Sequence, residues 1–328
     1  MLDVCLMGTG GSMPKPERHL ASALLRCGGA SIVIDCGEGT QIAMKKAEFA
    51  FSRIGLILIT HFHADHISGL PGMLLSMGNE GRVDPVVIAG PPGLTHVVSS
   101  ICIIARGLPF EVRLYEFPAG GGDLPGEVFA ESYDPAAMPW DSLEEAPAPA
   151  KGHGNPMTAF KIKSFPLHHS ITCLGYRISL PRAGKFDPDR ARAAGIPVNL
   201  WGLLQRGEAV GEYTPEDVLG APRRGIDVSY VTDTRPDDLI SSEVLRSDLL
   251  ICEGMFPSDK QERAKKSRHM TAAEAAYIAR DAEVGELWLT HYSPSVNETD
   301  ICLSEARAIF PDTTAGFDGM KKTIKFPE

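Results

Sequence analysis

Three histidines and one aspartate lie within six positions of one another, at His61, His63, Asp65 and His66. They follow Ile54–Ile59, an apolar run that predicts a short buried strand, and they precede an apolar stretch that predicts a helix from Ile67 to Met77. Four nitrogen and oxygen donors on a loop that leaves a rigid strand are what a divalent cation such as zinc requires. A polar turn without a metal is the alternative, but this alternation of histidine and aspartate has little structural use.

Similar side chains recur at the ends of later predicted strands. His291 closes Leu287–Thr290 much as His61 closes its own strand, and Asp233 ends the strand Val228–Val231. A third candidate, His169, lies on a loop between two short strands. Asp233 could instead cap a helix that begins near Pro236, and a lone histidine on a loop would be ambiguous. Asp35 is either a hydrogen-bond partner for a metal-bound histidine or a cap.

These motifs, in this order, resemble the metallo-β-lactamase superfamily of two-zinc hydrolases. Further matches along most of the chain resemble its ribonuclease Z branch, the endonucleases that trim the 3′ end of precursor tRNA. The resemblance implies an α/β fold, the αββα four-layer sandwich with an inserted arm, formed by residues 1–328 as a single domain. It also implies a homodimer.

The resemblance further implies two zinc ions per chain, or manganese or another divalent metal, held by seven residues. His61, His63 and His169 would bind one ion, Asp65, His66 and His291 would bind the other, and Asp233 would join them. In that scheme a water molecule activated by both metals attacks the phosphodiester, and Asp65 orients it as a base. His269, held by Glu253, would protonate the leaving 3′ oxygen or stabilise the phosphate in the transition state.

A formal net charge of −10 on its own disfavours a nucleic-acid partner, so a tRNA enzyme with this sequence must concentrate positive charge locally. The densest basic patch is 260–268, which includes Lys265, Lys266 and Arg268, although such a run is often only a solvated surface. Arg18 lies in Pro14–Ser22, which is similar to the Pro-x-Lys-x-Arg-Asn loop of ribonuclease Z, with His19 in place of the asparagine. We expect these four basic residues to bind the substrate.

Two segments interrupt the pattern of strands. Residues 119–157 are rich in glycine, proline and alanine, which predicts a surface insertion. Residues 181–224 contain one predicted short helix and resemble the tRNA-binding arm of ribonuclease Z, with Val198-Asn199 where the family has Gly-Pro. This arm has seven Lys or Arg against six Asp or Glu, so counterion release from it would be modest.

Composition sets the remaining limits. Hydrophobic residues make up 43% and charged residues 23%, which is typical of a globular protein, and no apolar run is long enough to span a membrane. The start, Met1–Met7, reads as a first strand rather than as a signal peptide, and the seven cysteines form no Cys-x-x-Cys pair. We therefore expect a cytoplasmic protein. A helix at Ile301–Phe310 and a strand at Thr323–Phe326 are expected to complete the second half of the sandwich.

Other functions stay open at this stage. A small-molecule phosphodiesterase of the cyclic-nucleotide type is favoured by the acidic charge and the altered arm. A thioesterase or lactamase-type hydrolase is more distant, since His269 and the arm argue against it. A metal-binding or regulatory protein without turnover would require a lost ligand, and none of the expected ligands is missing.

Overall fold

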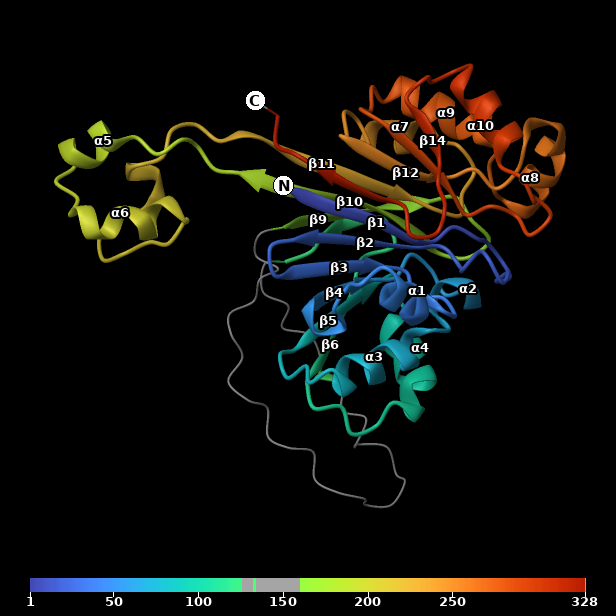
Figure 1. Ribbon diagram of the computed structural model, residues 1–328, viewed down its shortest axis with the longest axis horizontal. Coiled ribbons are helices and arrows are strands. Elements are labelled where there is room, and N and C mark those ends of the chain that lie inside the picture. Colours follow the sequence, from blue (N-terminus) through green and yellow to red (C-terminus); the bar gives the residue numbers. More distant parts are fainter. Residues whose placement is uncertain (126–131, 134–159, 328) are drawn as a thin grey trace.

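Two β-sheets pack face to face, and helices cover the outer face of each (Figure 1). The computed structural model describes residues 1–125, 132–133 and 160–327. From one side to the other the layers are helix, sheet, sheet and helix, so the predicted αββα four-layer sandwich is confirmed. The division of the chain into a single domain stays a prediction.

Most strands of the first sheet come from the N-terminal part of the chain. Its strands among the described residues are, in spatial order, β15 (Lys321–Ile324), β1 (Leu2–Gly8), β2 (Ser22–Cys27), β3 (Ala30–Ile34), β4 (Ile54–Leu58), β5 (Val86–Gly90), β6 (Val112–Glu116) and β8 (Ser132–Tyr133). Its outer face is covered by α1 (Thr40–Lys46), α2 (Ala64–Ile67), α3 (Leu70–Asn79) and α4 (Leu94–Ile101).

Most strands of the second sheet come from later in the chain, between residues 161 and 315. Its described strands are, in order, β14 (Thr313–Ala315), β13 (Leu287–Thr290), β12 (Leu249–Glu253), β11 (Arg223–Val231), β10 (Cys173–Arg182), β9 (Lys161–Leu167) and β7 (Gly122–Asp123). The helices on this side are α7 (Asp238–Glu243), α8 (Gln261–Ser267), α9 (Ala272–Asp281) and α10 (Asp300–Arg307). Short 3-10 turns lie at Phe51–Arg53, Cys102–Ile104 and Ser258–Lys260.

Strand β4 shows why the sheets are buried on both faces. Leu56 and Leu58 pack between the two sheets, whereas Ile57 and Ile59 pack under the helices outside the first sheet. Successive side chains of a strand point to opposite faces, so a continuous apolar run contributes to both cores. The buried strand predicted at Ile54–Ile59 is thus confirmed, and it gives the loop that follows a rigid base.

The predicted helix at Ile67–Met77 is wrong at its start. The chain forms one short helix, α2, breaks at Ser68 and Gly69, and resumes as α3 at Leu70. A Cβ on Gly69 would lie 2.1 Å from the carbonyl oxygen of Gly37, so only glycine allows this close approach. This break lets the segment that carries His61, His63 and His66 pack against the residues that follow β3.

The C-terminal strand also differs from its prediction. Strand β15 pairs with β1, with Leu2 opposite Ile324, and therefore extends the first sheet rather than the second. The physical reason is that β1 would otherwise be an exposed edge, which β15 covers. Helix α10 does lie beside α9 on the second sheet, as expected.

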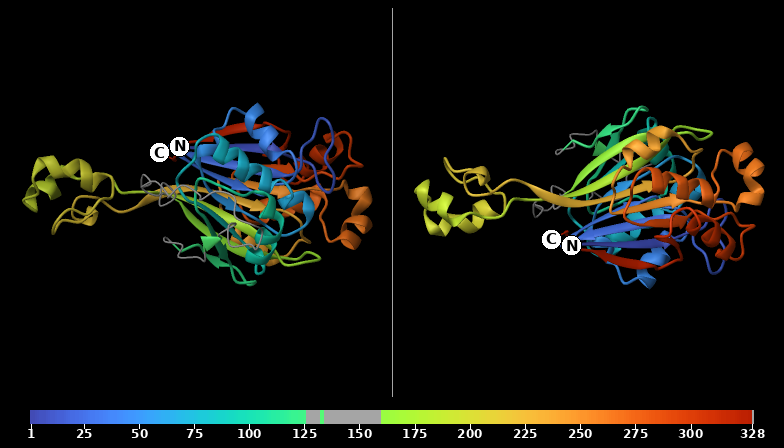
Figure 2. Two further views of the ribbon diagram at one scale, coloured as in Figure 1. Left: turned by 90° about the horizontal axis from the view of Figure 1, so that it is seen from below. Right: turned by 90° about the horizontal axis from the view of Figure 1, so that it is seen from above.

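An arm protrudes from one end of the sandwich (Figures 1 and 2). It comprises residues 183–222, between the paired ends of β10 and β11, and so lies within the predicted 181–224. It contains two helices, α5 (Pro188–Ala193) and α6 (Val198–Gln205), and a 3-10 turn at Pro215–Asp217, where one helix was predicted. Its own small core has four fully or nearly buried members, Ala191, Ile196, Leu204 and Val218.

Most of the predicted insertion 119–157 falls on residues 126–131 and 134–157, which lie outside the described residues. Its described parts include two short edge strands, β7 against β9 and β8 against β6. Within the described ranges, no helix is long and apolar enough to cross a membrane.

Candidate metal centre

The candidate site forms at one edge of the sandwich because parallel strands end there. Strands β11, β12 and β13 run parallel, so their carboxyl ends meet at the same edge. Asp233 follows β11, Glu253 ends β12 and His291 follows β13. The first sheet delivers the 61–66 loop from β4 to the same place, where the Leu174 N–H donates to the Thr60 carbonyl at 2.9 Å.

One half of the site contains His61, His63, His169 and Asp233, whose ligand atoms lie within 4.8 Å of one another. His63 Nδ1 lies 3.0 Å from His61 Nε2 and 3.3 Å from His169 Nε2. Asp233 Oδ2 lies 3.6 Å from the Nε2 atoms of both His61 and His169.

The other half contains Asp65, His66 and His291. The Nε2 atoms of the two histidines are 3.2 Å apart, and Asp65 Oδ2 lies 3.5 Å from each. Asp233 Oδ1 lies 3.1 Å from His291 Nε2 and 3.4 Å from His66 Nε2. The two oxygens of Asp233 therefore face different halves of the site.

Two of the histidines, His66 and His169, are oriented by hydrogen bonds on the nitrogen that faces away from the site. His66 Nδ1 lies 2.7 Å from Asp35 Oδ2, and His169 Nδ1 lies 3.1 Å from the Arg268 carbonyl oxygen. Both acceptors require the proton on Nδ1, which leaves the Nε2 lone pair directed into the site. This is the arrangement that a metal-bound histidine needs, so the residues present fit a divalent metal ion.

The buried carboxylates of Asp233 and Asp35 set the electrostatics of the site. Burial lowers the pKa of His66, but the carboxylates of Asp233 and Asp35 outweigh it and raise that pKa well above its usual value. Burial likewise raises the pKa of Asp233, yet His291, His66 and His61 hold it well below its usual range. The Asp233 carboxylate thus remains ionised and attracts a cation, which can be a proton on His66 or a metal ion in its place.

His269 and Glu253 form a buried pair beside this cluster. His269 Nδ1 lies 3.2 Å from Glu253 Oε1, and its Nε2 faces the site, 3.9 Å from Asp233 Oδ2. Glu253 is fixed by the Thr234 N–H, which donates to Oε1 at 2.6 Å. Burial lowers the pKa of His269, but Glu253 and Asp233 raise it to about 9. His269 also groups with Asp233 and His291 as a potential ligand set.

Unusual backbone conformations gather around the site. Seven described residues other than glycine have a positive φ, and four of them lie here: Ser12, Asp35, Arg268 and His291. Such conformations are costly and persist only where the surrounding structure enforces them. The backbone at this edge is therefore shaped to aim these side chains and amides.

Comparison with known proteins places the chain in a family. It is 44% identical to the ribonuclease Z of Lachnospira eligens over 333 residues, which cover 100% of this chain and 99% of the relative. The chain belongs to the ribonuclease Z family. A family model described as Anti-Pycsar protein Apyc1 also matches residues 2–94, a segment that includes the 61–66 loop.

Two solved structures have folds similar to that of this chain. The short form of human tRNase Z has a TM-score of 0.65 at 22% identity, covering 99% of this chain and 100% of that one. The metallo-β-lactamase fold protein YhfI from Bacillus subtilis also has a TM-score of 0.65, at 18% identity, covering 98% and 100%. The sandwich is thus the metallo-β-lactamase fold.

The structural settings of the four basic residues predicted to bind substrate differ. Lys266 is exposed, and Lys265 pairs with Glu262 at 2.9 Å. The Arg268 guanidinium donates to the His169 carbonyl at 2.6 Å, and that of Arg18 donates to the Val296 carbonyl at 2.8 Å. The arginines therefore hold segments of the protein together, and substrate binding by all four stays a prediction.

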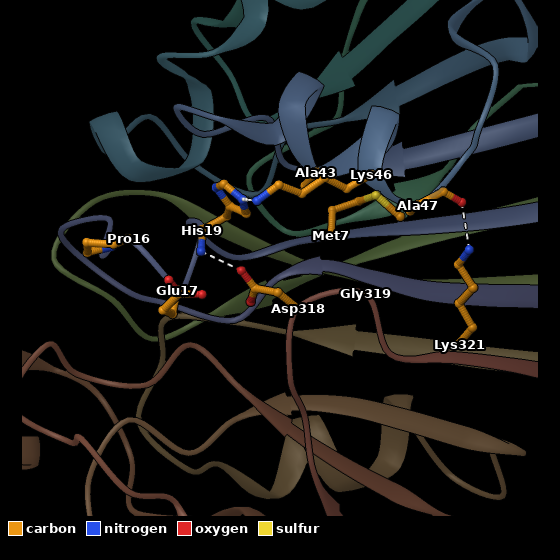
Figure 3. A pocket seen from close by; sticks show the side chains of 10 residues that line it. All are labelled: Met7, Pro16, Glu17, His19, Ala43, Lys46, Ala47, Asp318, Gly319 and Lys321. Carbon is orange, nitrogen blue, oxygen red and sulfur yellow. Dashed lines mark hydrogen bonds between the residues drawn. The ribbon is translucent and has the colours of Figure 1, made fainter.

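The loop that carries Arg18 also lines a pocket of about 320 Å³. Figure 3 shows His19 and Lys46 pointing toward each other there, with Lys46 Nζ 3.5 Å from His19 Nε2. The Asp318 carboxylate on the opposite wall accepts the His19 N–H at 2.5 Å. His19, which replaces the asparagine usual in ribonuclease Z, is thereby held in this pocket.

Sequence reasoning missed several residues that shape the site. Thr60 bonds both Asp35 oxygens and lies 3.1 Å from His61 Nδ1. A Cβ on Gly11 would lie 2.5 Å from the His291 ring, and the Ser12 N–H donates to Asp65 Oδ2 at 2.6 Å. The glycine-rich turn after the first strand could have pointed to Gly11 as a position of close approach. The only feature of the sequence that could have pointed to Thr60 is its place next to His61.

Proposed function

We propose that this member of the ribonuclease Z family is a metal-dependent endoribonuclease that removes the 3′ trailer from precursor tRNA. The observation that carries the proposal is Asp233, whose Oδ1 faces His66 and His291 while its Oδ2 faces His61 and His169. A carboxylate placed in this way can join two metal ions, the arrangement that suits phosphodiester hydrolysis.

Seven residues would hold two zinc ions: His61, His63 and His169 on one side, Asp65, His66 and His291 on the other, and Asp233 between them. When bound, two such cations activate a water molecule and offset the negative charge that develops on the phosphate. The donor set contains only imidazoles and carboxylates, which zinc and manganese both accept.

The chain's own residues move the protons. Asp65 lies in the half of the site that contains His66 and His291, and its side chain is 12% exposed. Its carboxylate can accept a proton from the attacking water. His269 turns Nε2 toward the site because Glu253 engages Nδ1. His269 is therefore placed to protonate the leaving 3′ oxygen, the role of a general acid.

The arm supports a homodimer. Strand β10 begins beside the site, where Cys173 Sγ lies 3.6 Å from His61 Nδ1, and it ends at the arm. Ten residues of strand span roughly 30 Å, so the arm leaves the sandwich far from its own metal centre. An arm in that position can hold the body of a tRNA whose 3′ end enters the centre of a second copy.

The setting of the cysteines agrees with a cytoplasmic location. All seven are free thiols, and six of them are buried. A reducing compartment keeps thiols in this state, so we place the protein in the cytoplasm.

A small-molecule phosphodiesterase of the cyclic-nucleotide type is the second candidate, and the arm's charges favour it. Arg190 donates to the carbonyls of Leu219 and Glu216, Arg192 pairs with Asp189, and Arg206 pairs with Glu208. Guanidinium donors that are engaged within the protein are less available to phosphates, and the carboxylates of Asp189 and Glu208 also offset the charges of Arg192 and Arg206.

Parallel assays on two substrates separate the candidates. The purified protein with added divalent metal is given a precursor tRNA with a 3′ trailer and, separately, a 3′,5′-cyclic nucleotide. We expect kcat/KM to be higher for the tRNA by orders of magnitude, and His63→Ala to abolish cleavage. Turnover of the cyclic nucleotide with no cleavage of tRNA would reject the endoribonuclease.

A further inference from the structure

Arg235 lies two residues after Asp233 and contacts the segment that carries His269. We propose that Arg235 is a positioning residue, which holds the backbone of His269 so that its imidazole stays aimed at the metal centre. The inference rests on the proposed function, because it requires His269 to act as the proton donor. Arg235 itself is not a catalytic residue, since none of its described contacts is with a side chain of the metal cluster.

The side chain of Arg235 makes three hydrogen bonds in two directions. Its Nη1 donates to the His269 carbonyl oxygen at 2.5 Å. Its Nη1 and Nη2 also donate to the two carboxylate oxygens of Glu274, at 3.1 and 2.5 Å. A planar guanidinium is suited to this task, because its fixed fork of donors can bind a carboxylate and a carbonyl at once.

Glu274 is a rigid partner because it belongs to a helix cap. The Thr271 N–H donates to Glu274 Oε2 at 2.9 Å, and the Thr271 hydroxyl accepts the Glu274 N–H at 3.2 Å. This reciprocal capping box fixes the start of α9, whose N-cap residue Thr271 lies two residues after His269. Arg235 therefore ties His269 to a helix end that has little freedom to move.

The backbone around Arg235 links the other parts of the site. The Arg235 N–H donates to the His168 carbonyl at 3.0 Å, next to the ligand His169. The neighbouring Thr234 N–H donates to Glu253, which holds the His269 ring. Residues 233–235 thus contribute a ligand, fix the partner of the proposed acid, and fix the acid's own backbone.

A purely structural role is the alternative, because an arginine–glutamate pair with side chains 23% and 14% exposed can also stabilise the fold. The two roles differ in what they do to catalysis. A positioning residue acts through His269 and should lose its effect on the rate once that imidazole is removed. A structural residue should affect every variant equally.

The test is a double-mutant cycle on precursor tRNA with Arg235→Lys and His269→Ala. Lysine keeps the charge but lacks the fork, so the His269 carbonyl and Glu274 cannot both be held as before. We expect Arg235→Lys alone to lower kcat roughly 10–100-fold, the usual effect of a displaced catalytic group, with little change in KM. In the His269→Ala background the same change should lower kcat by less than about 2-fold.

Two controls make the result specific. Bis(p-nitrophenyl) phosphate releases a weakly basic phenolate that needs no proton donor, so Arg235→Lys should leave its hydrolysis, and the bound metal, nearly unchanged. Arg246→Lys alters an exposed pair with Glu283 on the same half of the sandwich and should leave both activities unchanged.

Additive losses in the cycle, or an equal loss on both substrates, would overturn the inference and leave Arg235 a structural residue. Failure of the proposed function would look different, because the wild-type protein would then not cleave tRNA at all. In that case the double-mutant cycle is measured with a 3′,5′-cyclic nucleotide as the substrate. Its leaving group is also an alkoxide that requires a proton.

Discussion

Three side chains of the candidate centre, those of His66, His169 and Asp65, are each held by a neighbour that does not itself face the metal site. Asp35 fixes His66, the Arg268 carbonyl fixes His169, and the Ser12 amide fixes Asp65. Such partners orient ligands and are expected to matter nearly as much as the ligands themselves.

Asp35→Asn should weaken metal binding by roughly 10–100-fold, because the amide cannot stabilise the His66 proton as a carboxylate does. Asparagine tolerates the left-handed backbone, and Asp35 has a φ of 59°, so the fold should be retained. Metal retained during dialysis against a chelator measures the effect. Asp3→Asn, which alters a partly exposed pair with Arg26, serves as the control. Equal metal retention in both variants would contradict the role of Asp35.

Gly11→Ala should displace His291, since the new Cβ would lie 2.5 Å from its buried ring. We expect weaker metal binding and a kcat lowered by at least about 10-fold, as for other displaced groups of an active site. Gly29→Ala is the matched control, because the nearest atom to its Cβ would be 3.7 Å away. Metal content and kcat, measured for both variants, test this displacement. A fully active Gly11→Ala would show that His291 is free to move.

His269→Ala should leave the metal content at the wild-type level and lower kcat on RNA by roughly 10²–10⁴-fold, the usual contribution of a positioned proton donor. Metal analysis and single-turnover kinetics on the same protein test this. Loss of metal together with activity would instead make His269 a ligand, as its grouping with Asp233 and His291 allows.

The donors could be predicted from the sequence because each follows a strand and belongs to a residue type with few structural uses there. Thr60 and Arg235 could not, since their importance comes from hydrogen bonds rather than from residue type. Arg235 and His269, for example, are 34 positions apart. Arg18 and Arg268 show the converse, because a basic side chain looks available in sequence until its protein acceptors are known.

At the scale of elements, the strand ends were predictable and the connections were less so. The apolar run Ile54–Ile59 specifies β4 through its pattern alone, whereas the break at Gly69 depends on a contact with Gly37, in the loop that follows β3. The pairing of β15 with β1 likewise depends on an edge that no local pattern reveals. One helix was predicted in the arm where two form, since α5 and α6 are separated by only the four residues 194–197.

The arm can be removed without disturbing the sheet. Arg182 pairs with Arg223 in an antiparallel ladder, so replacing residues 183–222 with Asn-Gly should close β10 and β11 as a hairpin. We expect cleavage of precursor tRNA to fall by orders of magnitude, while hydrolysis of bis(p-nitrophenyl) phosphate stays nearly unchanged. Equal loss of both activities would mean that the arm is structural, and equal retention would favour a small-molecule substrate.

At the scale of the whole molecule, the arm leaves the sandwich at the end of β10 (Figure 1), whereas the metal centre lies beside the start of that strand. A net charge of −10 leaves little general attraction for RNA, so binding must depend on particular surfaces and on the metals. In a homodimer, the arm of a second copy could lie near this centre and hold the tRNA that this chain's own arm is too far away to hold.

Mixing two inactive forms tests that arrangement. The chain with residues 183–222 replaced keeps its centre, and His63→Ala keeps its arm. If one copy's arm serves the other copy's centre, the mixture should cleave precursor tRNA well above the sum of the separate proteins. A mixture with no gain, from chains that sedimentation shows to be mixed dimers, would mean that each arm serves its own centre.

The central claim is that this centre hydrolyses a phosphodiester by direct attack of water, with the 3′ oxygen of the tRNA as the leaving group. Analysis of the ends produced from precursor tRNA tests it most directly. The account predicts a tRNA that ends in a 3′-hydroxyl and a trailer that begins with a 5′-phosphate, and neither should form after metal removal or with His63→Ala. A 2′,3′-cyclic phosphate on the tRNA, or cleavage that persists without metal, would contradict it.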